Sequence, residues 1–234
     1  MKTAISLFIM AVSASAFAFT PGDDGLPKGW QLFQPNQKVA ATQYRLQQEK
    51  NEWVVHAVAK SSMAGLIKPM QVDLNKTPIL CWSWRIKAVV SNADLNTKAG
   101  DDYAARVYVL FDVPVNQIPF ADRVKVRLAK TFYGADLPTA AINYVWDNKH
   151  PIGTVAPNAY TDRTRLMVLQ SGNAQAGKWV RQARNVAKDY RTMFAGQLPM
   201  VAGLAIATDT DNTASNAEAW FSQPYFVSDQ SLCL

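Results

Sequence analysis

The stretch from Gly100 to Phe111 constrains the fold of this chain more than any other segment. Within it, two sets of residues alternate: Tyr103, Ala105, Val107, Val109 and Phe111, and between them Asp102, Ala104, Arg106 and Tyr108. Side chains alternate between the two faces of a β-strand, so this period of two predicts a central strand with one apolar face. The other face carries an acid, a cation and a phenol, which predicts either a ligand site or a buried polar network.

The first 18 residues have the features of a secretory signal peptide. Lys2 provides a positive start, residues 4–12 are an apolar run, and small alanines at 14, 16 and 18 suit cleavage. The run is too short to span a bilayer comfortably. We therefore expect residues 1–18 to be removed, and residues 19–234 to form one periplasmic or secreted domain, because no linker-like stretch divides them.

The charge of the chain favours no nucleic-acid partner. The formal net charge is +6, and loss of Lys2 leaves +5. The basic residues are spread along the chain, as on an ordinary solvated surface. A sharper alternative is attraction to an anionic component of the cell envelope.

Short segments with alternating apolar residues and intervening turn signals follow one another along the chain. They lie at 30–33, 42–48, 53–60, 71–74, 79–88, 142–147, 165–170, 202–208 and 217–226. Such a series predicts a mainly β protein, specifically a jelly-roll-like antiparallel β-sandwich.

One or two peripheral helices are expected beside the sandwich. In residues 178–194, apolar residues recur at intervals of four and three, which predicts a helix; they are Trp179, Ala183, Val186, Tyr190 and Phe194. Residues 123–132 show a weaker helical spacing.

The two cysteines, Cys81 and Cys233, leave two alternatives open. An exported protein can form a disulfide, but Cys81 lies in a predicted strand and Cys233 is next to the C-terminal residue. A bridge therefore requires the C-terminal tail to dock beside that strand. Otherwise the chain carries two separate thiols.

Motifs of common catalytic classes are missing from the sequence. There is no G-x-S-x-G, no H-E-x-x-H and no phosphate-binding glycine-rich loop. The only histidines are His56, expected to pack on a strand face, and His150, expected in a polar loop. This excludes a multi-histidine metal centre and favours a non-catalytic protein.

The acidic loop around Asp209 is the candidate metal site. Asp209, Asp211 and Asn212 offer closely spaced oxygen ligands of the kind that calcium accepts. The alternative is a turn in which these side chains bond to their own backbone.

The polar face of the 100–111 stretch is the candidate ligand site. Asp102 and Arg106 are four residues apart, about 13 Å by strand rise, so they cannot pair with each other. Arg106 needs an acid from elsewhere, such as Asp209, Asp211, Asp147 or Asp189, because an unpaired buried arginine is costly. The predicted ligand-binding set is Arg85, Asp102, Arg106, Tyr108, Tyr144 and Trp146.

Several motifs, in order along the mature chain, resemble a known bacterial exported family. They are Leu26-Pro27-x-Gly29-Trp30, Leu80-x-Trp82-x-Trp84-Arg85, Gly100-Asp101-Asp102-Tyr103-Ala104-Ala105-Arg106, Asn143-Tyr144-Val145-Trp146, Arg184-Asn185-Val186-x-x-Asp189-Tyr190-Arg191 and Thr208-Asp209-Thr210-Asp211-Asn212-Thr213. The chain resembles the family called domain of unknown function 3047, a resemblance that implies no activity. A weaker likeness to galactose-binding-like jelly rolls rests on the segments at 53–60, 61–64 and 79–88; such domains often bind glycans and hold calcium.

The leading hypothesis is therefore a non-catalytic envelope protein that binds a glycan or other polar ligand at Asp102, Arg106 and Tyr108. The alternative is a structural or protein-interacting envelope component in which these residues form an internal network. A third hypothesis is a glycan-active hydrolase or lyase that uses Asp102, Asp209 or Asp211 as acid or base. It requires two carboxylates across an open cleft.

Overall fold

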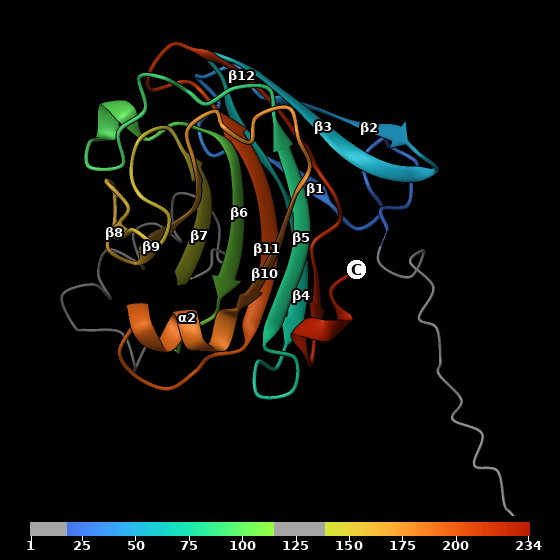
Figure 1. Ribbon diagram of the computed structural model, residues 1–234, viewed down its shortest axis with the longest axis vertical. Helices are drawn as coiled ribbons and strands as arrows, with labels where there is room; N and C mark the ends of the chain where they lie inside the picture. The colour runs from blue at the N-terminus through green and yellow to red at the C-terminus, as the bar shows by residue number, and fades with distance from the viewer. Residues whose placement is uncertain (1–17, 115–138) are drawn as a thin grey trace, which may run out of the picture.

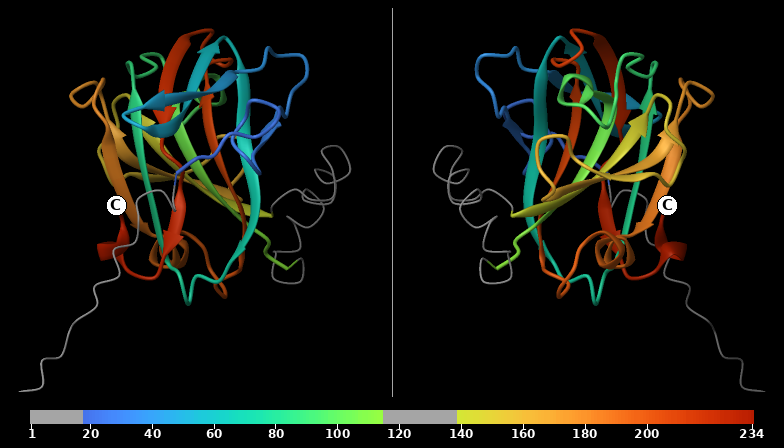
Figure 2. Two further views of the ribbon diagram at one scale, coloured as in Figure 1. Left: turned by 90° about the vertical axis from the view of Figure 1, so that its right-hand side faces the viewer. Right: turned by 90° about the vertical axis from the view of Figure 1, so that its left-hand side faces the viewer.

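The computed structural model describes residues 18–114 and 139–234, which form two stacked β-sheets (Figures 1 and 2). The larger sheet has seven strands in the order β1-β4-β11-β6-β7-β9-β8. The smaller sheet has six, with the path β10-β5-β12-β3-β2 and with β13 paired to β5. The predicted β-sandwich is confirmed. Among the described strands, all pairs are antiparallel except the parallel pair β7–β9.

The strands of the larger sheet are β1 (Gln31–Phe33), β4 (Met63–Val72), β6 (Tyr103–Phe111), β7 (Ala140–Asp147), β8 (Val155–Pro157), β9 (Thr164–Ser171) and β11 (Val201–Asp209). Those of the smaller sheet are β2 (Gln43–Glu49), β3 (Glu52–Lys60), β5 (Ile79–Ile86), β10 (Val180–Asn185), β12 (Asn216–Phe221) and β13 (Tyr225–Val227). Helix α2 (Val186–Met193) and the 3-10 turns η2 (Lys98–Gly100) and η4 (Gln230–Leu232) complete the described elements.

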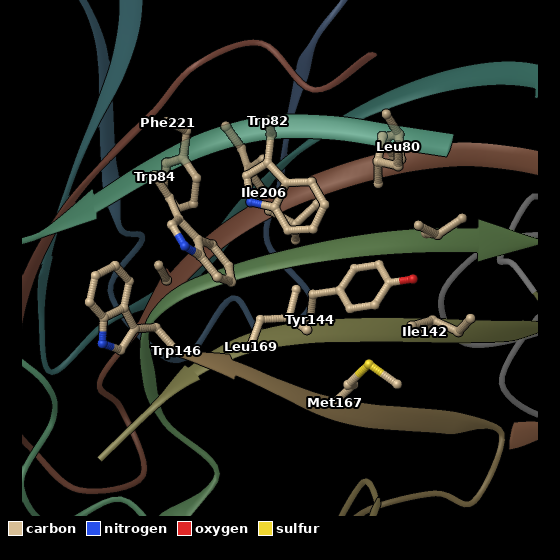
Figure 3. Close-up of a cluster of buried hydrophobic side chains, with 14 of the residues drawn as sticks. Leu80, Trp82, Trp84, Ile142, Tyr144, Trp146, Met167, Leu169, Ile206 and Phe221 are labelled. Carbon is tan, nitrogen blue, oxygen red and sulfur yellow. The ribbon is translucent and has the colours of Figure 1, made fainter. Parts of the chain in front are cut away.

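Large aromatic side chains fill the space between the sheets (Figure 3). Trp82 and Trp84 of β5 point from the smaller sheet toward Tyr144 and Trp146 of β7. The ring centroids of Trp82 and Tyr144 are 5.4 Å apart, and those of Trp84 and Trp146 are 6.0 Å apart. Burial of a large apolar side chain stabilises a fold by about 1.5–3 kcal/mol. The predicted alternation of side chains along β5 therefore places Trp82 and Trp84 on the face that packs against the larger sheet.

The helix predicted at 178–194 is wrong over its first half. Val180–Asn185 is strand β10, paired in register with β5 from Trp84 to Ile79, and only Val186–Met193 is helical. The strand lies at an edge of its sheet and has polar side chains on both faces, so it lacks a clear period of two. Trp179, just before the strand, and Ala183 within it matched a helical spacing by coincidence, and pairing with β5 overrides that local pattern.

Two other segment predictions also needed correction. The strand expected at 71–74 is the end of the longer β4, which begins at Met63 and was missed. The strand expected at 217–226 is two strands, β12 and β13, with Pro224 between them. Residues 1–17 of the expected signal peptide and the whole of 123–132 lie outside the described residues.

The C-terminal tail docks on the outer side of β5. Strand β13 places Tyr225 opposite Cys81, and Cys81 forms a disulfide with Cys233. The bridge closes a loop of 152 residues, worth ~4–5 kcal/mol on the chain-entropy model. Of the two alternatives left open by the sequence, the structure thus has the bridge. Within the described ranges, no helix combines the length and apolarity needed to cross a membrane.

Candidate functional site

Arg106 is the centre of a sealed polar network on the outer side of β6. Its side chain is 2% exposed and forms ion pairs of 3.0 Å with Asp101, through Nη2, and with Asp209, through Nε. Nη1 donates a hydrogen bond of 2.8 Å to the Tyr108 hydroxyl, and Nη2 also donates to the main-chain carbonyl of Asp101. The guanidinium carbon lies 4.3 Å from the centroid of the Tyr103 ring. Nη1 and Nη2 therefore make hydrogen bonds with protein groups, whereas Nε contacts Asp209 as an ion pair without hydrogen-bond alignment.

A β-bulge brings Tyr103 to the same side of the sheet as Arg106. On β11, Ala207 pairs with Arg106 and Asp209 pairs with Tyr103. The two partners are three residues apart on β6 but only two apart on β11, so β6 carries one extra residue here. An extra residue of this kind turns the following side chains to the opposite face. The prediction that Tyr103 shares the apolar face of Val107 is therefore wrong, because strict alternation is interrupted at the bulge.

Asp102 has a different role from Arg106. Its carboxylate is fully buried and accepts hydrogen bonds from the backbone N–H of Asn212 at 3.2 Å and of Thr213 at 2.6 Å. It also accepts a bond of 2.6 Å from the Thr213 hydroxyl. Asp102 thus fastens the loop after β11 to the start of β6, and its oxygens are not available to a ligand.

Burial controls the acid–base properties of this network. Desolvation raises the pKa of Asp209 to about 7; Arg106 opposes this rise, and the neighbouring Asp101 and Asp102 add to it. Burial likewise raises the pKa of Tyr108 to about 12, again opposed by Arg106. One cation cannot neutralise three carboxylates, so a proton on Asp209 is stabilised in the folded state.

The geometry does not favour a catalytic role for these acids. Asp102 and Asp209 are 0% and 7% exposed, whereas an acid and a base of a glycosidase flank an open cleft that admits the sugar. Asp211 is partly exposed, and burial followed by Asp102 raises its pKa. The hydrolase or lyase hypothesis is thus without support from the described residues.

The predicted calcium ligands do not converge. Asp209 is paired with Arg106 and accepts the backbone N–H of Tyr103, while the Asn212 amide donates to the Tyr160 hydroxyl. No group of three His, Cys, Asp or Glu side chains in the described part of the chain could hold a metal ion. Calcium at this loop stays a prediction from sequence.

The remaining predicted ligand residues lie elsewhere. Tyr144 and Trp146 point into the core, where the Tyr144 hydroxyl donates to Asp189 at 2.7 Å. Arg85 lies on the outer face of the smaller sheet. The six residues therefore fall in three places: the sealed network, the core between the sheets, and an exposed face of the opposite sheet.

Arg85 belongs to a row of cations and aromatic rings that crosses the smaller sheet. We call this set the aromatic–cation row; its members, in order from β2 to the residue before β10, are Arg45, His56, Trp220, Arg85 and Trp179. Arg45 Nε donates to His56 Nδ1 at 3.1 Å, and the His56 and Trp220 rings stack at 4.7 Å. The Arg85 guanidinium carbon lies 4.2 Å from the Trp220 ring centroid and 5.0 Å from that of Trp179.

Polar side chains fix the orientation of this row. Glu49 accepts hydrogen bonds from Arg85 at 2.6 Å and from the Trp179 indole N–H at 3.2 Å. Gln47 accepts the Trp220 indole N–H at 3.4 Å. Trp179 is nevertheless 37% exposed. The row therefore presents an exposed, oriented indole beside an acid, an amide and a guanidinium.

Two members of this row, Arg85 and Trp220, could be placed on their strand faces from the sequence alone. The period of two in β5 placed Arg85 on the face opposite Trp84, and in β12 it separated Trp220 from Ala219. Trp179 was missed because it was assigned to a helix. The neighbours of Arg85 follow only from the strand order β10-β5-β12-β3-β2, which brings distant segments side by side.

Comparison with solved structures finds low overall similarity spread over most of the chain. A family 12 xyloglucanase from Bacillus licheniformis is 10% identical, with a TM-score of 0.48 over 90% of this chain and 96% of that one. The endoglucanase 3 of family GH12 from Trichoderma harzianum is 8% identical, with a TM-score of 0.44 over 88% and 91%. The xyloglucanase domain of NopAA, a type three effector from Sinorhizobium fredii, solved with cellobiose, is 9% identical, with a TM-score of 0.41 over 86% and 93%.

A search of curated protein sequences gives no match. The model of one protein family, in contrast, matches residues 28–225, which include the Arg106 network and every member of the aromatic–cation row. The chain therefore belongs to the family described as protein of unknown function DUF3047, as its sequence motifs predicted.

Proposed function

We propose that this protein is a non-catalytic domain of the cell envelope that binds a glycan through the aromatic–cation row. The observation that carries the proposal is the Trp179 indole, which is 37% exposed and held by both Glu49 and Arg85. A sugar offers apolar C–H faces and hydroxyl groups, so an aromatic ring beside fixed polar groups suits it. Because the indole is already oriented, little side-chain entropy is lost on binding.

The groups around Trp179 have the right chemistry for sugar hydroxyls. Glu49 and Gln47 offer acceptor oxygens, and Arg85 and Arg45 offer N–H donors that can also be shared with a ligand. The Glu49 and Arg85 side chains are 22% and 20% exposed, so part of each faces solvent. The Arg106 network is a weaker candidate for direct contact, because Arg106 and Asp102 are buried and occupied.

A glycan array that contains peptidoglycan fragments and neutral oligosaccharides tests this proposal, followed by calorimetry with the glycans that bind. We expect Trp179→Ala to weaken binding by about tenfold or more, the scale of one aromatic contact. Trp179→Phe keeps a ring and is expected to lose less. Ile152→Ala, at a side chain 63% exposed in the loop before β8, is the control and should bind as the wild type does.

A structural or protein-interacting envelope component is the second candidate function. The burial of Asp102 and Arg106 favours it, because buried charges that are paired and hydrogen-bonded within the protein, as these are, serve stability. No glycan binding by the native protein, together with a large loss of stability in Arg106 variants, supports this second function. Binding that is unchanged in Trp179→Ala contradicts the proposed site.

A further inference from the structure

Two partly buried arginines, Arg163 and Arg165, lie at the start of β9 without an acidic partner among the described residues. Nη2 of Arg163 and Nε of Arg165 are buried and have no hydrogen-bond partner in residues 18–114 and 139–234. Among the described residues, the one side-chain hydrogen bond of this pair runs from Arg163 Nε to the carbonyl oxygen of Thr139 at 2.9 Å. A desolvated cation without a counter-charge is costly in a folded protein. This arrangement therefore points to an anion that completes the site.

The two arginines face the same region of the molecule. They are two residues apart and so project to one side of the strand. Arg165 lies opposite Ile142 of β7, whose side chain is in the core, so this side is the inner face of the larger sheet. Helix α2 lies at this end of the sandwich (Figure 1). Burial raises the pKa of Tyr190 on α2 and Arg163 opposes the rise, as expected for a cation close to that helix.

The acid on α2 that faces this region is already fully used. Asp189 accepts two hydrogen bonds from Arg184, at 2.6 and 3.0 Å, and one from the Tyr144 hydroxyl at 2.7 Å. Arg184 Nη2 also lies 3.3 Å from the sulfur of Met167, which is next to Arg165 on the same face of β9. Asp189 therefore balances Arg184, and no acid in the described part of the chain forms an ion pair with Arg163 or Arg165.

We propose that Arg163 and Arg165 bind a single oxyanionic group, a carboxylate or a phosphate. Guanidinium N–H groups form charge-assisted, often bidentate hydrogen bonds with carboxylates and with phosphates. The carboxylate is planar and the phosphate tetrahedral, but both offer anionic oxygens as acceptors. The site lies on a different sheet from the aromatic–cation row and does not depend on the proposed glycan binding. The anionic group can come from a free inorganic ion or from an acidic sugar, and the two sources are separable by experiment.

Isothermal titration calorimetry at constant ionic strength provides the test, with inorganic phosphate, galacturonate and neutral galactose as three separate probes. We expect saturable binding of phosphate or galacturonate and none of galactose at this site. Arg165→Gln and Arg163→Gln are expected to weaken anion binding by about tenfold or more, the loss of one or two charge-assisted hydrogen bonds. Arg181→Gln, at an exposed arginine of β10, is the matched control for loss of one positive charge.

A thermal unfolding experiment without any anion supplies a second readout. Because Nε of Arg165 is buried without a hydrogen-bond partner among the described residues, Arg165→Gln is expected to leave the melting temperature unchanged or to raise it. Phosphate binding alone identifies a free ion as the source, and galacturonate binding alone identifies an acidic sugar; both support the site.

Three results overturn the proposal. They are no saturable binding of either anion by the wild type, undiminished binding in both glutamine variants at positions 163 and 165, or an equal loss in Arg181→Gln. Trp179→Ala is expected to leave anion binding unchanged, so failure of this site and failure of the glycan site are distinguishable.

Discussion

Arg106 and Asp209 form an ion pair of 3.0 Å between side chains that are 2% and 9% exposed. The pair joins β6 to β11 at the point where the β-bulge interrupts their register. Because both groups are removed from water, the loss of Arg106 leaves Asp101 and Asp209 buried without a counter-charge.

Arg106→Leu is therefore expected to lower the free energy of unfolding by ~3–5 kcal/mol, the usual cost of breaking a buried pair. Urea denaturation followed by tryptophan fluorescence measures the change. Arg181→Leu, at an exposed arginine of β10, is expected to change stability by no more than about 0.5 kcal/mol. Similar stability of the two variants contradicts a structural role for Arg106.

Asp209 is expected to make stability depend on pH between about 4 and 7. Its pKa is about 7 when folded and 3.8 in its ordinary state, so the folded protein holds a proton that the unfolded chain releases. This contribution is fully present below pH 3.8 and is lost as the pH rises through 7. The stability of the wild type relative to Asp209→Asn should fall when urea titrations are repeated from pH 5 to pH 8; a constant or rising difference refutes the assignment.

His56 is expected to act in the opposite direction. Burial, and then the positive charge of Arg45, lower the pKa of His56 below 6.5 in the folded state. Its contribution is present above pH 6.5 and is lost as the pH falls toward the folded pKa, because the unfolded chain takes up the proton first. The advantage of the wild type over His56→Gln should shrink from pH 7.5 to pH 5 in chemical denaturation, and an advantage that grows in acid counts against this view.

Removal of the Cys81–Cys233 bridge is expected to destabilise the protein by ~2–5 kcal/mol. The bridge fixes the C-terminal tail beside β5, where Val227 packs with Ile79 and Cys81. The double variant Cys81→Ala/Cys233→Ala and the reduced wild type should show similar drops in melting temperature. Dithiothreitol should have no effect on the double variant, and a wild type that is insensitive to the reductant contradicts a formed bridge.

The alternation of apolar residues was enough to predict most of the sandwich, and particular strands show why. In β5 and β3, every second residue is apolar. A strand places these residues on one face, and a shift of register by one residue would move them all out of the core. The pattern failed at β10, an edge strand with polar residues on both faces, and at the β6 bulge. In both places a partner strand, and not the local sequence, decides which way side chains point.

The predicted site was only partly recovered for the same reason. The sequence placed Asp102 and Arg106 on one face and required an acid from elsewhere for Arg106, and Asp209 is one such acid. It did not indicate that loop backbone would enclose Asp102, or that Asp101 would share Arg106. Enclosure depends on how loops from distant parts of the chain fold over a strand.

By itself, then, the sequence determined a β-sandwich and a charged side of β6, because side-chain periodicity is a local property of a strand. Tertiary structure alone decided that this charged side is sealed, that the tail is bridged to β5, and that Trp179 joins Arg85 and Trp220. These outcomes depend on strand order and register, which bring together residues as far apart as Arg45 and Trp220, and no local pattern records which distant segments become neighbours.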